Sequence, residues 1–203
     1  MRLSKGRLYI VSGPSGAGKD TVLSEVFQYC PEISFSISSV TRPMRPGEIQ
    51  GEKYNFISKE KFEQMITLNQ LLEHNVFVGN YYGTPKEPVE KSLNEGKDMI
   101  IEIDVNGAAQ IKKNMPQAIS IFIMPPSFSA LRDRLTNRGT DSSDIIERRI
   151  TVAYDEIARA TEYDYIVVND DLGSAVQDFV SIIKSERLKT SRCTDIISEI
   201  LNK

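Results

Sequence analysis

The segment GPSGAGK, from Gly13 to Lys19, has the residue types and the spacing of a phosphate-binding loop. The glycines of such a loop let backbone N–H groups converge on phosphate oxygens, at the start of a helix whose dipole favours anions. The lysine can then bridge the β- and γ-phosphates of a nucleotide. A plain glycine-rich turn is the alternative, but the strand-like sequence before the segment and the helical pattern after it favour phosphate binding. We therefore predict that the loop residues Gly13, Pro14, Ser15, Gly16, Ala17, Gly18 and Lys19 bind phosphate.

Asp20 departs from the usual pattern, in which a Ser or Thr hydroxyl after the lysine faces a magnesium ion. Thr21 could supply that hydroxyl instead, or Asp20 could hold Mg²⁺ through water, since this ion prefers oxygen ligands. A catalytically weak site is a third interpretation. An aspartate at a helix N-terminus can also simply cap the helix and complement its dipole. We favour a combination of the first two, with Asp20 and Thr21 at the metal.

Two further groups of charged residues suit phosphate chemistry. Arg42 and Arg45 are three apart in a basic loop, with Tyr54 downstream, and guanidinium groups bind phosphate oxygens in pairs. A solvated basic loop is the alternative. Glu102 and Asp104 are two apart at the end of an apolar run, so a strand would project both to one side, as at the acidic end of a Walker B strand. Charges that merely mark a strand end would look the same.

The elements that must position these residues alternate along the chain. Apolar runs at 7–12, 34–40, 98–105, 118–124 and 165–168 predict strands, and helices are predicted between them, including 58–68 with Ser58 as its cap. Residues 71–82 mix short strand and turn signals, and another helix is expected from Pro85 to Gly96. The pattern predicts an α/β fold of the P-loop NTPase type, a parallel sheet with helices on both faces. The polar, turn-rich region at about 38–95 is interpreted as an inserted lobe.

Composition narrows the possible functions. The chain has 203 residues with a net charge of -3, so it offers no general field for a nucleic-acid backbone, and no apolar run is long enough for a membrane helix. Strand-like sequence begins near Arg7, and we expect no signal peptide. Two distant cysteines make no disulfide framework, which favours a cytoplasmic protein. His74 is the only histidine, which excludes histidine-based metal sites and catalytic triads.

Seven segments together resemble the guanylate kinase family: GPSGAGK, SSVTRPMRPGE, GEKYNF, GNYYGTP, IEIDVNGA, NRGT and VVNDDL. They run in the family's order and with similar spacing from Leu8 to about Leu172. The resemblance implies a kinase that transfers the γ-phosphoryl group of ATP to GMP, and also to dGMP, with Mg²⁺. It implies one domain over residues 1–203, with a core at about 1–37, 96–137 and 149–203, a GMP lobe at about 38–95 and an arginine-containing lid at about 138–148.

The resemblance assigns roles at the acceptor site. Arg42, Arg45 and Tyr54, in a set with Glu48, would hold the GMP phosphate. Glu73 would face the guanine edge, where N1–H and the exocyclic amine lie side by side. A site that hydrogen-bonds a substrate group can reject an analogue lacking it by about 10⁴–10⁵. Further residues placed at this site by the resemblance are Ser38 and Thr84 near guanine O6, Tyr82 beside GMP, Asp104 on the guanine side, and Glu102 near the magnesium and its waters.

At the donor site the resemblance places three arginines, Arg134, Arg138 and Arg149, over ATP, where they would offset charge on the transferred group. Interspersed acidic residues also fit a salt-bridged pair of surface helices. Asn169 would meet the adenine ring. Two other functions stay open: a kinase resembling ribose 1,5-bisphosphate phosphokinase, which often carries Asp after the loop lysine, and a non-catalytic guanylate-kinase-like binding module.

Overall fold

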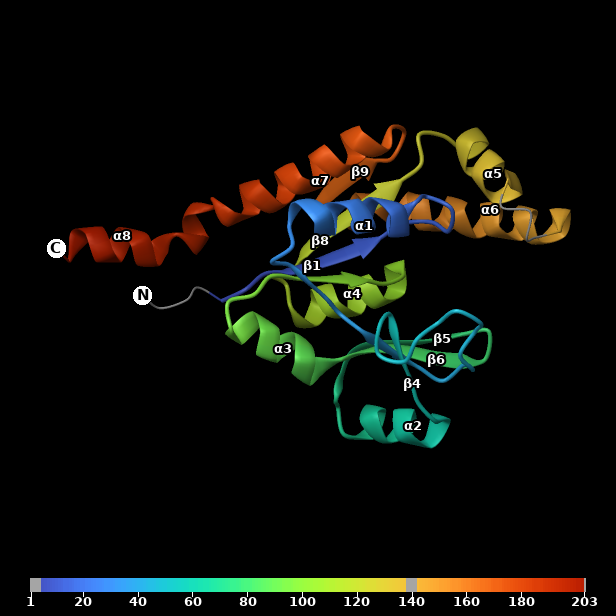
Figure 1. Cartoon of the computed structure of the whole chain (residues 1–203), viewed down its shortest axis with the longest axis horizontal. Coiled ribbons are helices and arrows are strands. Elements are labelled where there is room, and N and C mark those ends of the chain that lie inside the picture. The colour runs from blue at the N-terminus through green and yellow to red at the C-terminus, as the bar shows by residue number, and fades with distance from the viewer. Residues whose placement is uncertain (1–4, 138–141, 203) are drawn as a thin grey trace. The chain divides into compact units, whose positions relative to one another are not determined.

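The computed structural model describes residues 5–137 and 142–202. Helices and strands alternate along the chain, as predicted (Figure 1). The chain forms two compact units. The first comprises Ser12–Glu32 and Ile121–Lys203, and the second comprises Lys5–Val11 and Ile33–Ser120. The predicted lobe at about 38–95 falls within the second unit, whereas the lid predicted at about 138–148 begins on residues that lie outside the described ranges.

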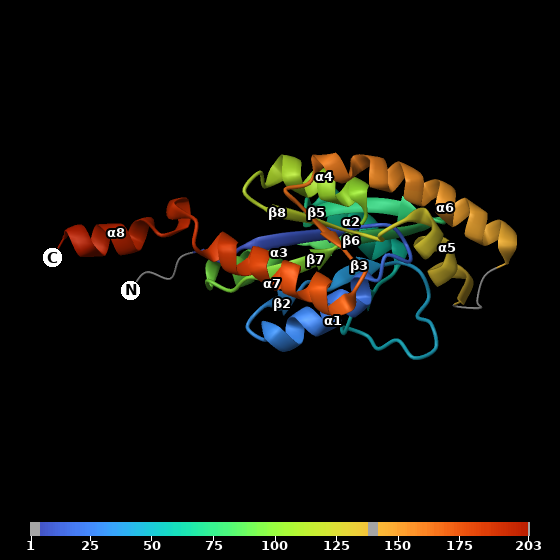
Figure 2. The same cartoon turned by 90° about the horizontal axis from the view of Figure 1, so that it is seen from above.

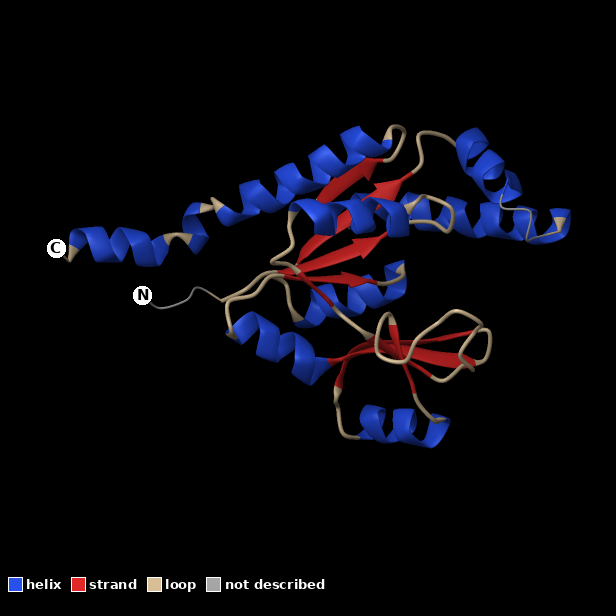
Figure 3. Ribbon diagram, viewed as in Figure 1, coloured by secondary structure: helices blue, strands red, loops and turns tan. Residues whose placement is uncertain are grey.

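The parallel sheet confirms the α/β prediction. Its strand order is β2-β7-β1-β8-β9. Figure 3 shows its strands in red. The bounds of its strands are β1 Leu8–Ser12, β2 Ser34–Phe35, β7 Met99–Glu102, β8 Ile119–Met124 and β9 Tyr165–Val168. All five residues of β1 are buried, as are the first five of β8. Continuous apolar runs of this kind are typical of parallel strands covered on both faces.

The first unit contains the parallel pair β8 and β9. The bounds of the helices in this unit are α1 Lys19–Tyr29, α5 Phe128–Asn137, α6 Ser143–Ala158, η1 Arg159–Glu162, α7 Leu172–Arg187, η2 Thr190–Arg192 and α8 Thr194–Leu201. α1 packs beside α7, which Figure 2 shows from above. Val22 and Val26 of α1 are buried, like Phe179 and Ile183 of α7, and form apolar faces at helical spacing. Among the helices of residues 5–137 and 142–202, none combines the length and hydropathy needed to cross a bilayer.

The second unit carries a four-stranded sheet of its own, in the order β4-β3-β6-β5. Its strands and the helices of this unit are β3 Ser38–Val40, β4 Tyr54–Phe56, α2 Lys59–Thr67, β5 Leu71–Phe77, β6 Asn80–Pro85, α3 Lys86–Asn94 and α4 Val105–Asn114. Ser58 caps α2 by accepting a hydrogen bond from the N–H of Lys61, as predicted. β5 and β6 form an antiparallel hairpin whose turn places Val78 at φ 47° and Gly79 at φ 73°.

Two predicted strands are shorter than expected. The run at 34–40 divides into β2 and β3, because the N–H of Ser36 still bonds to the carbonyl of Ile100 whereas Ser39 and Val40 pair with β6 of the other sheet. The run at 98–105 ends at Glu102, because the next residues turn into α4. Asp104 is therefore not a strand residue, and the expectation that one strand projects Glu102 and Asp104 to the same side is wrong.

Candidate active site

The predicted phosphate loop lies between β1 and α1, and close packing dictates two of its glycines. A Cβ atom at Gly13 would stand 2.0 Å from the carbonyl oxygen of Ile123 on β8. Gly18, with φ 87°, is the N-cap residue of α1, and a Cβ there would stand 2.4 Å from Nδ2 of Asn169. Both positions would clash with any side chain, and Gly18 also has the left-handed backbone that glycine tolerates. The loop is thus shaped by its neighbours as well as by its own glycines.

Lys19, Asp20 and Thr21 form the first turn of α1, directly after the loop. The Lys19 Nζ donates hydrogen bonds to the carbonyl oxygens of Gly13 and Pro14, at 2.7 and 3.2 Å. Gly18 is the N-cap, so the interpretation of Asp20 as a cap is wrong, although its carboxylate does lie in the first turn, where the dipole favours it. The hydroxyl-bearing Thr21 lines the pocket beside the loop. That Thr21 takes the hydroxyl role stays a prediction.

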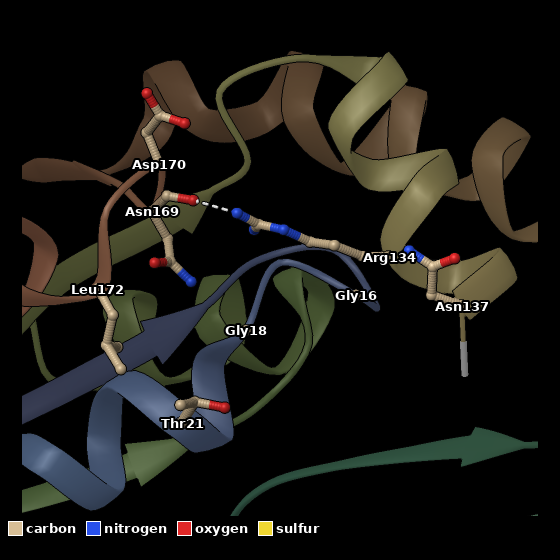
Figure 4. Close-up of a pocket in the computed structure, with 8 residues that line it drawn as sticks. All are labelled: Gly16, Gly18, Thr21, Arg134, Asn137, Asn169, Asp170 and Leu172. Atoms are coloured by element: carbon tan, nitrogen blue, oxygen red, sulfur yellow. Dashed lines mark hydrogen bonds between the residues drawn. The ribbon is translucent and has the colours of Figure 1, made fainter.

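A pocket of about 460 Å³ opens beside the loop (Figure 4). The Arg134 guanidinium on α5 donates to the backbone carbonyl of Asn169 at 2.7 Å, and the Asn169 side-chain amide donates to the carbonyl of Ala17 at 2.8 Å. Asn169 therefore ties the chain after β9 to the phosphate loop, a role that sequence reasoning missed. The pocket is lined by Gly16, Gly18, Thr21, Arg134, Asn137, Asn169, Asp170 and Leu172.

Three of these lining residues, Asn137, Asp170 and Leu172, are absent from the sequence-based site. Asp170 and Leu172 belong to the segment VVNDDL, so the segment was recognised but only its asparagine received a role. Asn137 ends α5, one turn after Arg134, and α-helical spacing by three places both on one face. That spacing was the available signal for Asn137.

The arginines of α5 and α6 divide into two kinds. Arg149 on α6 donates a hydrogen bond to the hydroxyl of Ser15 in the phosphate loop, and Nη1 of Arg134 donates to the carbonyl oxygen of Ala17 in the same loop at 3.4 Å. Arg132 instead pairs with Glu147 and bridges α5 and α6. The salt-bridged helix pair therefore exists, but it does not use the arginines predicted to meet phosphate. Arg138 lies outside the described residues.

In the second unit Arg42 is buried and fixed by Glu48. Nη1 and Nη2 of Arg42 donate to the two carboxylate oxygens of Glu48, each at 2.6 Å, and Nη1 also donates to the carbonyl of Pro43 at 3.1 Å. The guanidinium lies 5.2 Å from the ring centroid of Tyr54. The hydrogen bonds to Arg42 lower the pKa of Glu48 to about 2 and raise the pKa of Arg42. The arginine predicted to bind phosphate is thus held charged and in one orientation.

The backbone N–H of Arg45 donates to Glu48 at 2.7 Å, so Glu48 also shapes the loop that carries Arg45. The ring of Tyr82 on β6 lies 6.4 Å from the ring of Tyr54, edge to face. A hydrogen bond with Tyr82 contributes to the raised pKa of Arg42. Three of the residues predicted at the phosphate of GMP, Arg42, Glu48 and Tyr54, are therefore brought together with Tyr82, which was predicted beside GMP.

Glu73 on β5 is a buried carboxylate, with 5% of its surface exposed. The Thr84 hydroxyl on β6 donates to its Oε1 at 2.7 Å, as the register that pairs Glu73 with Thr84 allows. Burial, with a smaller contribution from the nearby charge of Asp104, raises the pKa of Glu73 to about 7. A buried carboxylate costs free energy unless it is paired, so its retention here points to a ligand that donates hydrogen bonds.

The remaining predicted acidic residues have structural partners. Asp104 caps α4 by accepting from the N–H groups of Asn106 and Gly107, and its Oδ2 accepts from Nδ2 of Asn75 at 2.8 Å. Glu102 at the end of β7 pairs with Lys53 at 3.5 Å. Ser38 begins β3, in register with Tyr54. Within residues 5–137 and 142–202, no group of three or more acidic, His or Cys side chains is gathered to hold a metal.

Comparisons with known proteins agree with these features. The family model for guanylate kinase matches residues 5–186. The chain is 48% identical over 190 residues to a guanylate kinase of Carboxydothermus hydrogenoformans, covering 94% of this chain and 93% of that protein. It is 48% identical over 189 residues to one of Thiobacillus denitrificans, covering 93% and 90%. A solved guanylate kinase structure from Anaplasma phagocytophilum is 31% identical, with a TM-score of 0.77, covering 93% of this chain and 90% of that one.

Proposed function

Because the chain belongs to the guanylate kinase family, we propose that it transfers the γ-phosphoryl group of ATP to GMP, giving ADP and GDP. The observation that carries this proposal is the buried Glu73 carboxylate bonded to Thr84, in a unit that also holds a charged and oriented Arg42. Neither the ribose 1,5-bisphosphate phosphokinase nor the binding module is favoured, since neither needs both a purine-reading carboxylate and a complete phosphate loop.

Glu73 supports recognition of guanine over adenine. Guanine presents N1–H and an exocyclic amine as two adjacent donors, and one ionised carboxylate can accept from both. Adenine lacks that pair, so its binding would leave the buried carboxylate without the two donors of the base, which costs about 1–3 kcal/mol or more. Thr84 engages Oε1 of Glu73 from within the sheet, and this bond holds the carboxylate in place before the base arrives. Ser38 and Asp104 complete the proposed guanine site. The base contacts do not involve the sugar, so we expect dGMP to be accepted as well.

The hydrogen bonds of Arg42 indicate which side of its guanidinium group would bind the GMP phosphate. Glu48 takes one N–H of each terminal nitrogen, and the Pro43 carbonyl takes the other N–H of Nη1. A phosphate oxygen pair would then bind the side of the guanidinium formed by Nε and Nη2, in the two-pronged geometry that arginine favours, and would displace its hydrogen bond with Tyr82. Arg45 and Tyr54 are proposed to bind the same phosphate.

The phosphate loop supports binding of ATP. Lys19 now bonds to carbonyl oxygens, which are weaker partners for an ammonium group than phosphate oxygens, so the nucleotide would draw it away from them. Arg134 and Arg149 already contact the loop, and we propose that each offsets charge on the transferred group. Phosphoryl transfer requires little covalent help from the protein, so positioning and charge stabilisation account for catalysis.

Magnesium fits this site as an ion held mostly by phosphate oxygens and water. When bound, Mg²⁺ would neutralise charge on the phosphates. Thr21 lines the pocket and offers a hydroxyl, and Asp20 is exposed in the first turn of α1. We propose that these two residues hold the ion, directly or through water, with Glu102 as a further candidate. The small-molecule partners are thus ATP, GMP and Mg²⁺, and we propose a cytoplasmic location.

A panel of nucleoside monophosphates with ATP and Mg²⁺ tests the proposal. We expect GMP to be phosphorylated at least 10³-fold more efficiently than AMP, CMP or UMP, on the scale of discrimination that lost hydrogen bonds allow. Lys19→Ala should lower kcat by about 10²–10³-fold, because transition-state charge stabilisation is lost, while calorimetry should show GMP binding within twofold of wild type. Lys113→Ala, an exposed lysine on α4, is the matched control. A panel without preference for GMP would refute the assignment.

A further inference from the structure

Helix α4 runs against β5, the edge strand that carries Glu73, and makes a contact with each of three consecutive strand residues. Asp104 accepts a hydrogen bond from the Asn75 side chain, the Cα of Gly107 lies against Glu73, and Gln110 bonds to the backbone of His74. The N-cap residue Asp104 and the helix residues Gly107 and Gln110 are spaced by three, so they share one face of α4.

The side chain of Gln110 makes the two backbone hydrogen bonds that a neighbouring strand would otherwise make with His74. Its side-chain Oε1 accepts from the N–H of His74 at 3.3 Å, and its Nε2 donates to the carbonyl oxygen of His74 at 3.1 Å. An edge strand otherwise presents such backbone groups to solvent. One amide side chain thus satisfies both outward-facing backbone groups of the residue next to Glu73 and fixes the strand at that point.

Gly107 leaves room for the Glu73 carboxylate. A Cβ atom at Gly107 would stand 2.9 Å from Oε2 and 3.2 Å from Cδ of Glu73. Gly107 lies within α4, where glycine is less favourable than alanine by about 1 kcal/mol. Its backbone is not left-handed, so close approach to Glu73 is the feature that demands glycine. The carboxylate is confined between Thr84 on one side and Gly107 on the other.

We infer that Gly107 and Gln110 are positioning residues that set the discrimination between guanine and adenine by fixing where the Glu73 carboxylate lies. The inference rests on the proposed function. A carboxylate that must accept two adjacent donors needs both oxygens at defined places, and a displacement of about 1 Å can cost on the order of 10²-fold in rate. Neither Gly107 nor Gln110 is assigned a contact with a nucleotide, so their effect acts through Glu73.

Two variants test this inference. Gln110→Met keeps the length and helix propensity of the side chain but removes both hydrogen bonds to His74, which is partly solvated and can bond to water instead. Gly107→Ala introduces the Cβ atom that meets Glu73. The readouts are the ratio of kcat/KM for GMP to that for AMP, the KM for ATP, the affinity for GMP by calorimetry, and Tm. Lys113→Ala, on the exposed side of the same helix, is the control.

We expect the GMP-to-AMP ratio to fall about tenfold in Gln110→Met and about 10²-fold in Gly107→Ala, with KM for ATP unchanged within twofold. The calorimetric affinity for GMP should fall with the ratio, and the control should match wild type. Unchanged ratios in both variants, while the wild type prefers GMP, would overturn the inference alone. Equal losses for GMP and AMP, accompanied by a lower Tm, would overturn it in favour of a purely structural role. A wild type without preference for GMP would instead overturn the proposed function.

Discussion

The pKa of Glu73 predicts how the binding of GMP depends on pH. Burial, with a smaller contribution from Asp104, raises this pKa to about 7. Only the ionised carboxylate can accept from both guanine donors, and the apparent dissociation constant is the intrinsic one divided by the competent fraction. That fraction is about 0.9 at pH 8 and about 0.1 at pH 6 for a single group titrating near 7. KM for GMP should therefore rise roughly tenfold as the pH falls from 8 to 6.

Steady-state kinetics at saturating ATP and Mg²⁺, at half-unit intervals from pH 6 to 8, measure this rise. The phosphate of GMP also titrates in this range, with a second pKa near 6, and would contribute in any variant. Glu73→Gln removes the carboxylate but leaves the titration of the GMP phosphate unchanged. The ratio of the KM for GMP of the wild type to that of the variant therefore reports the titration of Glu73 alone. Glu87→Gln, an exposed first-turn residue of α3, controls for the change of charge.

The result that would refute the reasoning is a ratio of KM values that stays constant from pH 6 to 8. Constancy would mean that Glu73 is ionised throughout the range or does not meet the base. At pH 8 the variant itself should bind GMP about 10–100-fold more weakly, because its amide turns a donor toward a guanine donor and leaves a buried group unpaired. Normal GMP affinity in Glu73→Gln would remove Glu73 from the proposed site.

Three further predictions concern stability and the metal. The unfolded state loses the Glu73 proton near pH 4.5, whereas the native state keeps it up to about pH 7. The free energy of unfolding therefore falls as the pH rises through this window, and above it the ionised Glu73 costs about 3 kcal/mol of stability. Glu73→Gln should therefore raise Tm by several degrees at pH 8 and little at pH 5, and an equal rise at both would contradict the cause. Val78→Asn should raise Tm by about 2–4 °C, because Val78 has φ 47°, which asparagine tolerates better than valine; a lower Tm in a thermal scan would count against it. Asp20→Ser should keep or raise kcat if Thr21 supplies the hydroxyl, whereas a fall of about 10²-fold that excess Mg²⁺ restores would assign the metal to Asp20.

Strong local signals predicted most of the fold. The apolar runs that became β1, β8 and β9 were located to within a residue or two, since a buried parallel strand needs a continuous apolar run and little else. The division of 34–40 between two sheets was missed because the pairing partners, Ile100 and β6, are distant in the sequence. The early end of β7 at Glu102 was missed because Asp104 could read as a strand end or as a helix cap, and only the N–H groups of the following turn decide between them.

Candidate site residues could be predicted where the chemistry of the residue itself indicates a role. Residue type and motif led to Lys19 and Arg42, whereas Glu73 was predicted from the family resemblance. Residues that act by contact with another residue gave no such signal. Neither Gly107 nor Gln110 is marked by its own residue type, because the need for either arises only when α4 lies against β5. Sequence periodicity describes one element at a time and carries no information on which strand a helix face meets.

The two groups proposed to bind GMP share a principle that distinguishes them from Lys19. Arg42 is hydrogen-bonded to Glu48, and Glu73 is hydrogen-bonded to Thr84. Each of the two groups keeps part of its hydrogen-bonding capacity for a ligand. The entropy of fixing these side chains is thus lost on folding and not on binding, which favours affinity. Lys19 instead spends its donors on two loop carbonyls that phosphate must displace. The acceptor site is therefore shaped before its ligand arrives, whereas the donor loop completes its contacts only with the triphosphate present.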